Sequence, residues 1–153
     1  MEKNEFKRFC DQEFSKRGFI KRKNMYYLSG AGVLCSLDLQ KSNYGEVYYV
    51  NYDFYIGNFF SLEDYPVKYD SGDLSGRFTV MSKTQTYHGK TFMTSQIEYQ
   101  EYTAEELRPI FDQQMEDIIF PPLKTGKKHL LEHLGEKYFL TLRREEVMKK
   151  LQE

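Results

Sequence analysis

A histidine pair in the last third of the chain has a spacing that could support metal chemistry. Residues 129–133 read His-Leu-Leu-Glu-His, which fits the H-x-x-E-H pattern of some zinc peptidases. Histidines at i and i+4 share one face of a helix, and the glutamate between them could act as a base. A catalytic zinc ion needs a third protein ligand, and few downstream carboxylates are available: Glu136, Glu145, Glu146 and Glu153. We therefore assign no metal centre. His129 and His133 stay open either to adventitious metal capture or to a solvated helix face.

Two aspartates form a second constellation. Asp38 and Asp53 fall on the polar side of two alternating segments, where a carboxylate pair could divide acid and base roles. Diagonal neighbours on paired strands lie about 7 to 8 Å apart, whereas a slip of two residues would separate them by more than about 10 Å. No catalytic residue is assigned on this evidence. The candidate ligand-binding or partner-binding residues are Asp38, Gln40, Lys41, Tyr49, Asn51 and Asp53.

A β-hairpin between Gly32 and Gly57 is predicted to position these residues. Apolar and polar side chains alternate on both sides of a turn cluster, Ser42-Asn43-Tyr44-Gly45. Pairing odd-numbered positions of the first strand with even-numbered positions of the second collects the apolar side chains on one face. The other face then carries Ser36, Asp38, Gln40, Tyr49, Asn51 and Asp53. One face of the hairpin must therefore be covered by another part of the chain.

Two helical stripes could supply that cover. Phe6, Phe9, Cys10 and Phe14 have helical spacing and predict a helix from Lys3 to Arg17. A capping box at Thr103–Glu106 precedes a second apolar stripe that ends at Pro121-Pro122. Further strands are expected at 24–28, 77–82 and 91–99, a long loop at 58–76, and two more helices at 125–134 and 141–151.

The elements together predict an α+β fold. We expect an antiparallel sheet of about five strands, covered on one face by the N-terminal helix and the C-terminal helices. A chain of 153 residues is the usual size of one domain, so we expect a single domain over 1–153, with a core at 3–123 and a helical extension at 124–153.

Composition limits the cellular compartment and the kinds of binding partner that we expect. Cys10 and Cys35 fall on apolar stripes, and neither a secretory signal nor an apolar run of about 18 residues is present. We therefore expect a cytoplasmic protein with free thiols and no membrane association. Residues 1–23 carry 8 basic and 4 acidic side chains, residues 33–120 carry 6 and 14, and residues 121–153 carry 8 and 5. Basic ends could bind a phosphate backbone or could pair with the acidic middle of the chain.

Several short motifs together resemble a known family. They are Gly18-Phe19 followed by Lys21-Arg22, Asn24 and Tyr27, then Leu39-Gln40-Lys41-Ser42, then Tyr49 and Asn51, and finally Phe120-Pro121. Over about Phe6 to Leu123 the chain resembles the bacterial family called domain of unknown function 4304. The resemblance implies a single α+β domain of bacteria or their phages, and it implies no activity, cofactor or catalytic residue.

Three functions remain open from the sequence. The chain holds 13 Tyr and 12 Phe but no Trp, and exposed tyrosines suit protein interfaces. Since no nucleophile motif or cofactor-binding loop is found, we expect no cofactor and favour a non-enzymatic module that binds another protein, such as an immunity or anti-defence factor. One alternative is a small-ligand binder or hydrolytic enzyme that uses the polar hairpin face. The other is binding of RNA or single-stranded DNA through the basic ends and aromatic side chains.

Overall fold

The predicted hairpin forms the centre of the sheet. In the computed structural model, β3 (Val33–Lys41) pairs antiparallel with β4 (Tyr48–Ile56), and Leu37 lies opposite Tyr52. Odd positions of β3 therefore face even positions of β4, as the alternation predicts. The structure describes residues 1–57, 59, 61–67, 71–141 and 143–153.

The hairpin is extended on both sides into an antiparallel sheet of six strands, one more than expected. The strand order is β1-β2-β3-β4-β5-β8, and the added strands are β1 (Ile20–Arg22), β2 (Met25–Gly30), β5 (Leu74–Arg77) and β8 (Phe139–Leu140). A second, two-stranded sheet consists of β6 (Val80–Met81) and β7 (Met93–Thr94). The α+β fold class is confirmed.

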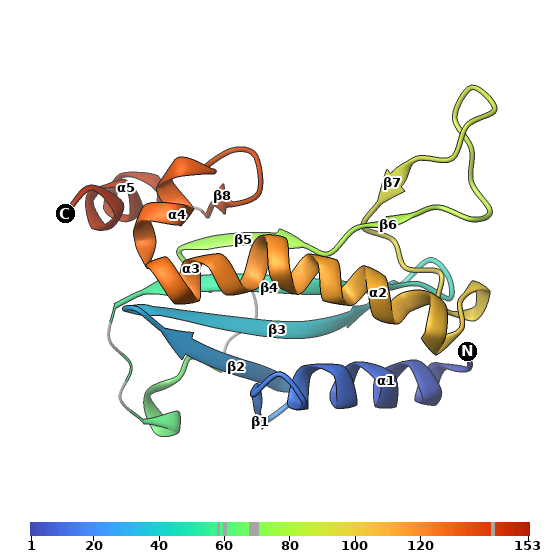
Figure 1. Ribbon diagram of the computed structural model, residues 1–153, viewed down its shortest axis with the longest axis horizontal. Coiled ribbons are helices and arrows are strands. Elements are labelled where there is room, and N and C mark those ends of the chain that lie inside the picture. The colour runs from blue at the N-terminus through green and yellow to red at the C-terminus, as the bar shows by residue number, and fades with distance from the viewer. Residues whose placement is uncertain (58, 60, 68–70, 142) are drawn as a thin grey trace.

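Helices pack against the apolar side of the hairpin. They are α1 (Lys3–Ser15), α2 (Ala104–Gln114), a π-helical turn (Met115–Ile119), α3 (Phe120–Thr125), α4 (Lys127–Glu132) and α5 (Arg144–Gln152), with a 3-10 turn at Tyr99–Glu101. A second 3-10 turn, Leu62–Asp64, has no buried residue and belongs to the loop after β4. The path from α2 to α3 runs along the sheet next to α1 (Figure 1). No helix among the described residues is long and apolar enough to cross a bilayer.

Aromatic side chains make the contact between helices and sheet. Phe6 of α1 stacks on Tyr48 of β4 at 5.3 Å between ring centroids, and Phe14 meets the ring of Tyr26 edge-on at 5.0 Å. Phe9 joins α1 to Phe111 of α2 at 5.2 Å. All six are buried, and burying a side chain of this size contributes about 1.5 to 3 kcal/mol. The helical stripes predicted from spacing thus form one core with the hairpin.

Three short strands differ from the expectation, and each depends on local detail. β1 joins β2 through Lys23 and Asn24, which both adopt positive φ, as a tight two-residue hairpin turn requires. Most of the strand expected at 91–99 is replaced by β7 and a 3-10 turn. The strand expected at 77–82 is interrupted because the Thr79 backbone N–H donates to the Gln114 side chain at 3.1 Å instead of to a neighbouring strand.

The C-terminal segment also contributes to the sheet, although only helices were expected there. β8 pairs with β5, and the preceding Tyr138 is fully buried, donating a hydrogen bond to the Ile118 carbonyl oxygen at 2.6 Å. Lys150 of α5 lies 3.1 Å from the buried carboxylate of Asp73, which also accepts a hydrogen bond from the Ile56 backbone N–H at 2.8 Å. An acidic group of the middle segment is therefore neutralised by a basic group of the C-terminal end.

A buried glutamate joins the N-terminal helix to α2. Glu13 is almost fully buried, and its carboxylate lies 2.9 Å from Lys16, 3.3 Å from Arg17 and 3.6 Å from Arg108 of α2. Burial alone would raise the pKa of Glu13, but the hydrogen bonds and charges of Lys16 and Arg17 outweigh it and lower the pKa below its usual value. Glu13 belongs to the N-terminal segment itself, but Arg17 also pairs with Asp112 of α2. This ion pair joins a basic group of the N-terminal end to an acidic group of the middle segment, as one interpretation of the charge pattern suggested.

We predict that Glu13→Gln lowers the free energy of unfolding by about 1 to 2 kcal/mol at pH 7. Because folding lowers the pKa of Glu13, the ionised side chain stabilises the folded protein at pH values above its unfolded-state pKa, which is about 4.3. This stabilisation is lost as the pH falls through the folded-state pKa. Urea denaturation of both proteins should therefore show a difference that shrinks between pH 7 and pH 3.5. Glu116→Gln, at an exposed glutamate, is the control. A difference that does not change with pH would contradict this account.

Candidate functional site

A hydrogen-bonded group of polar side chains lies on the sheet face opposite the helices. The Asn51 amide nitrogen donates to Asp38 and to Gln40, each at 3.1 Å, and its oxygen accepts from Nε of Arg77 at 2.9 Å. A second guanidinium nitrogen of Arg77 donates to Gln40 at 3.2 Å. We call Asp38, Gln40, Tyr49, Asn51 and Arg77 the Asn51 network.

Strand register explains why these residues meet. Asn51 lies opposite Asp38 on β3 and opposite Arg77 on β5, and Gln40 lies opposite Tyr49. Directly opposite residues share a face and have neighbouring side chains. The predicted hairpin therefore brings four candidate residues together, and β5 adds Arg77, which the sequence showed only as the first residue of an expected strand.

Arg77 is held in place by neutral groups. Its guanidinium carbon lies 4.0 Å from the centroid of the Tyr49 ring, and its hydrogen bonds go to the side-chain oxygens of Asn51 and Gln40. A cation above an aromatic face is attracted by the ring quadrupole. These three neighbours carry no charge, so they orient the guanidinium of the exposed Arg77. The one carboxylate of the network, Asp38, is joined to Arg77 through the Asn51 side chain.

Much of the polar hairpin face is buried. Asp38 is 6% exposed and Asp53 is 2% exposed, and Ser36 and Asn51 are buried with them. The polypeptide after β4 covers part of this face: the Gly72 backbone N–H donates to Asp53 at 3.3 Å. Residues 58, 60 and 68–70 of this loop lie outside the described residues. Asp38 and Asp53 are diagonal neighbours in the observed register.

A tyrosine cluster closes the other end of the same face. Tyr27, Tyr55 and Tyr65 gather there with Met25 and Leu34. The Tyr27 hydroxyl donates to the Pro66 carbonyl oxygen, and the Tyr55 hydroxyl lies 2.7 Å from Ser71 Oγ. Burial is the main reason that the pKa of Tyr55 is raised to about 12, so this hydroxyl stays protonated at neutral pH.

A hollow of about 390 Å³ borders the network on the β5 side. This volume is within the usual range for small-molecule sites, about 300 to 1,000 Å³. Polar and apolar groups both line it, including Asn51, Asp53, Ser75, Arg77 and Phe139. The hollow could hold a small molecule against the Arg77 guanidinium.

Lys41 does not join the network. It lies opposite Tyr48 at the end of β3, and its ammonium group donates to the Gly45 carbonyl oxygen at 2.5 Å and lies 3.8 Å from Glu46. An odd position in β3 faces away from Asp38 and Gln40. Lys41 therefore stabilises the hairpin turn.

The two histidines singled out by sequence do lie together. His129 on α4 and His133 at its C-terminal end have ring centroids 4.4 Å apart, and Glu132 lies beside them. Burial lowers the pKa of His129, and the neighbouring His133 and Lys137 lower it further, so this imidazole is neutral at pH 7.

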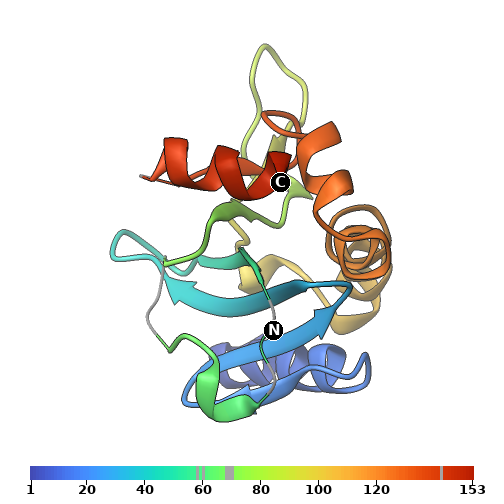
Figure 2. The ribbon, with the colours of Figure 1, turned by 90° about the vertical axis from the view of Figure 1, so that its left-hand side faces the viewer.

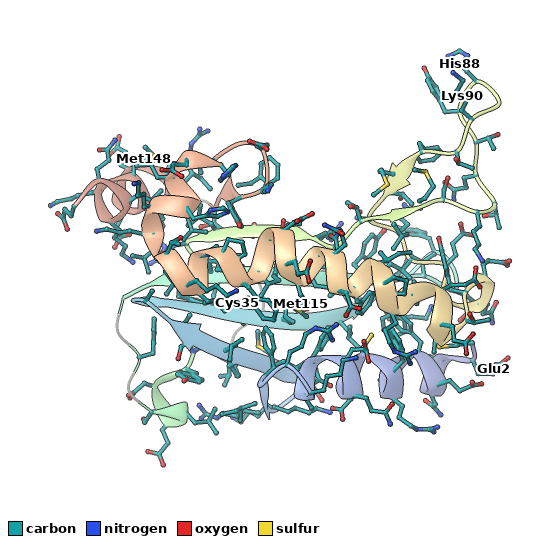
Figure 3. All side chains as sticks on the ribbon, in the orientation of Figure 1. Glu2, Cys35, His88, Lys90, Met115 and Met148 are labelled. Carbon is teal, nitrogen blue, oxygen red and sulfur yellow. The ribbon has the colours of Figure 1, made fainter. Side chains whose placement is uncertain are left out.

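The cysteines show no features of a reactive thiol. Cys10 and Cys35 are free and fully buried, and burial raises the pKa of both thiols well above the usual value. Nucleophilic cysteines need a lowered pKa and access to solvent. Cys35 lies in the interior between the helices and the sheet (Figure 3).

Exposed apolar side chains lie mainly elsewhere than expected. Most of the described tyrosines are buried or half-buried, Tyr69 lies outside the described residues, and Tyr44 and Tyr87 are clearly exposed. The segment from β6 to β7 adds Met81 and Met93, whose exposure the sequence did not predict. These methionines occupy positions that a strand pattern could place on either face of a sheet, so their exposure to solvent is known only from the fold.

One comparison with known proteins places the chain in a family. The family described as "Domain of unknown function (DUF4304)" matches residues 10–125. No curated protein and no solved structure matches the chain significantly. Because the family match covers well over half of the 153 residues, this chain belongs to the DUF4304 family.

Proposed function

We propose that this DUF4304 domain is a non-enzymatic binding module that recognises another protein through the segment from Val80 to Thr94, which we call the β6–β7 arm. The observation that carries the proposal is the position of this arm, which projects from the body of the molecule in two perpendicular views (Figure 1, Figure 2). Projecting hairpins can enter a groove on a partner with little change in the domain that displays them.

The arm displays large apolar side chains to solvent. Met81 is 47% exposed, Met93 is 54% exposed and Tyr87 is 71% exposed. Met81 and Met93 are direct cross-strand partners, so their side chains lie on the same face of the arm. Methionine and tyrosine are enriched in protein interfaces, where methionine adapts its shape to the opposing surface. The expected partner surface is therefore an apolar groove of another protein.

Hydrogen bonds hold the arm in shape. Ser82 is buried, its hydroxyl donates to the Gln85 carbonyl oxygen at 2.7 Å, and its backbone N–H donates to the Phe92 carbonyl oxygen at 2.9 Å. At the base, the Tyr102 hydroxyl donates to the Met81 carbonyl oxygen at 2.7 Å. A partner that binds this arm gives up less conformational entropy than one that must first order a flexible loop.

We predict that replacing Met81 and Met93 together by serine reduces partner recovery about tenfold or more, because the shared apolar face is lost. The measurement is affinity capture of the purified protein from nuclease-treated lysate of its source organism, with quantitative mass spectrometry. Both side chains are exposed, so the thermal midpoint should stay unchanged.

Ile20→Ser is the matched control, since Ile20 is a similarly exposed apolar residue on the edge strand β1. It should recover the partner as the unmodified protein does. Equal recovery by all three proteins would contradict the role of the arm. A partner that is recovered from untreated lysate but not from nuclease-treated lysate would favour RNA or single-stranded DNA binding instead.

A second candidate function is binding of a small anionic ligand in the hollow beside the Asn51 network. The specific observation is the Arg77 guanidinium, which Asn51, Gln40 and Tyr49 orient toward a space of about 390 Å³. Arginine binds carboxylate and phosphate groups through paired hydrogen bonds. The remaining N–H groups of Arg77 would contact such an anion.

We predict that Arg77→Gln abolishes binding of inorganic phosphate to this hollow, while Arg8→Gln, at an exposed arginine of α1, leaves it unchanged. Phosphate titration followed by NMR should shift the amide signals of Ser75, Gly76 and Arg77 in the unmodified protein, because these residues line or border the hollow. Signals that do not shift, or that shift equally in Arg77→Gln, would dispose of this candidate.

A further inference from the structure

The histidine cluster on α4 has the geometry of a metal site. His129, Glu132 and His133 each offer a potential ligand atom, and these three atoms all lie within 4.8 Å of one another. His129 and Glu132 belong to α4, and His133 is its C-terminal cap residue, so all three are placed by one turn of backbone. The four-residue spacing keeps the imidazole rings on one side of the helix.

The imidazole nitrogens are available for a ligand. His133 Nδ1 lies 3.3 Å from Glu136 Oε2, and a proton shared in this contact leaves Nε2 of His133 free to coordinate. Nε2 of His129 is buried and has no hydrogen-bond partner among the described residues. A buried polar atom without a partner destabilises the folded protein, and a bound ion would remove that cost.

Surrounding groups restrict the movement of the site. The ring of Tyr138 meets the ring of His129 at 5.9 Å between centroids, and both Tyr138 and the neighbouring Leu130 are fully buried. These contacts hold the His129 side of the cluster on the body of the protein. Among the described residues, the Glu132 carboxylate makes one ion pair, a long one with Lys128 at 3.9 Å, which a metal ion could displace.

We propose that His129, Glu132 and His133 bind one divalent transition-metal ion of the Zn²⁺ class, with Glu136 as a positioning residue for His133. Two imidazoles and one carboxylate suit Zn²⁺, Co²⁺ or Ni²⁺, whereas Mg²⁺ and Ca²⁺ prefer all-oxygen sets. Tetrahedral Zn²⁺ with ligand bonds of about 2.1 Å holds ligand atoms about 3.4 Å from each other, so the three atoms, now within 4.8 Å, would close up by side-chain rotation on binding. The fourth position is left for water or for a group from outside the chain.

The test titrates tag-free protein with Co²⁺ and with Zn²⁺, using visible absorption for Co²⁺ and calorimetry for Zn²⁺. We expect one equivalent to bind, with a tetrahedral Co²⁺ spectrum and a higher thermal midpoint. His133→Gln and Glu132→Gln should each weaken binding on the order of tenfold or more, and Glu136→Gln should weaken it less. His133 and Glu132 are accessible enough for the fold to tolerate these changes, and His129→Gln adds a third test.

The chain provides its own control. His88 is the third of three histidines and lies at the tip of the β6–β7 arm, away from α4 (Figure 3). His88→Gln should bind the metal as the unmodified protein does. Loss of binding in His88→Gln, equal binding in His133→Gln, or no binding by the unmodified protein would each overturn the proposal.

Discussion

The pairing of odd positions in β3 with even positions in β4 is the constraint on which the rest of the structure depends. It collects Cys35, Leu37, Tyr52 and Phe54 on one face, where α1, α2 and the π-helical turn form the main core. The same register leaves Asp38, the partner of Asn51, on the other face. A shift by one residue would exchange the two faces and bury carboxylates under the helices, so the hydrophobic effect and the cost of burying charge specify the same pairing.

The polar face follows from that pairing but is not simply solvated. The loop after β4 covers Asp53, and β5 brings Arg77 to Asn51. The buried side chains of Asp53 and Asn51 are therefore hydrogen-bonded. The C-terminal segment then extends the sheet and neutralises Asp73 through Lys150. Some of the basic groups at the two ends of the sequence are therefore paired with acidic groups of the middle within the fold. The projecting β6–β7 arm, by contrast, exposes apolar side chains to solvent.

Periodic patterns predicted the parts of the fold that local sequence determines. The hairpin register and the helical stripes of Phe6, Phe14 and Phe111 follow from spacing alone. The strands β1 and β8 were missed because each is too short for a period to show, and β8 depends on a partner more than 60 residues away. Of the candidate site, the meeting of Asp38, Gln40, Tyr49 and Asn51 was predictable, but Arg77 and the exposure of Met81 were not, because both depend on long-range packing.

The most direct test of the binding proposal is site-specific photo-crosslinking in the source organism, with a photoreactive phenylalanine derivative at position 87 or, as a control, at position 44. Both native residues are exposed tyrosines, but Tyr87 belongs to the β6–β7 arm and Tyr44 to the β3–β4 turn. Our account predicts one discrete protein adduct from position 87 and none from position 44. No adduct from position 87, or the same adducts from both positions, would contradict it.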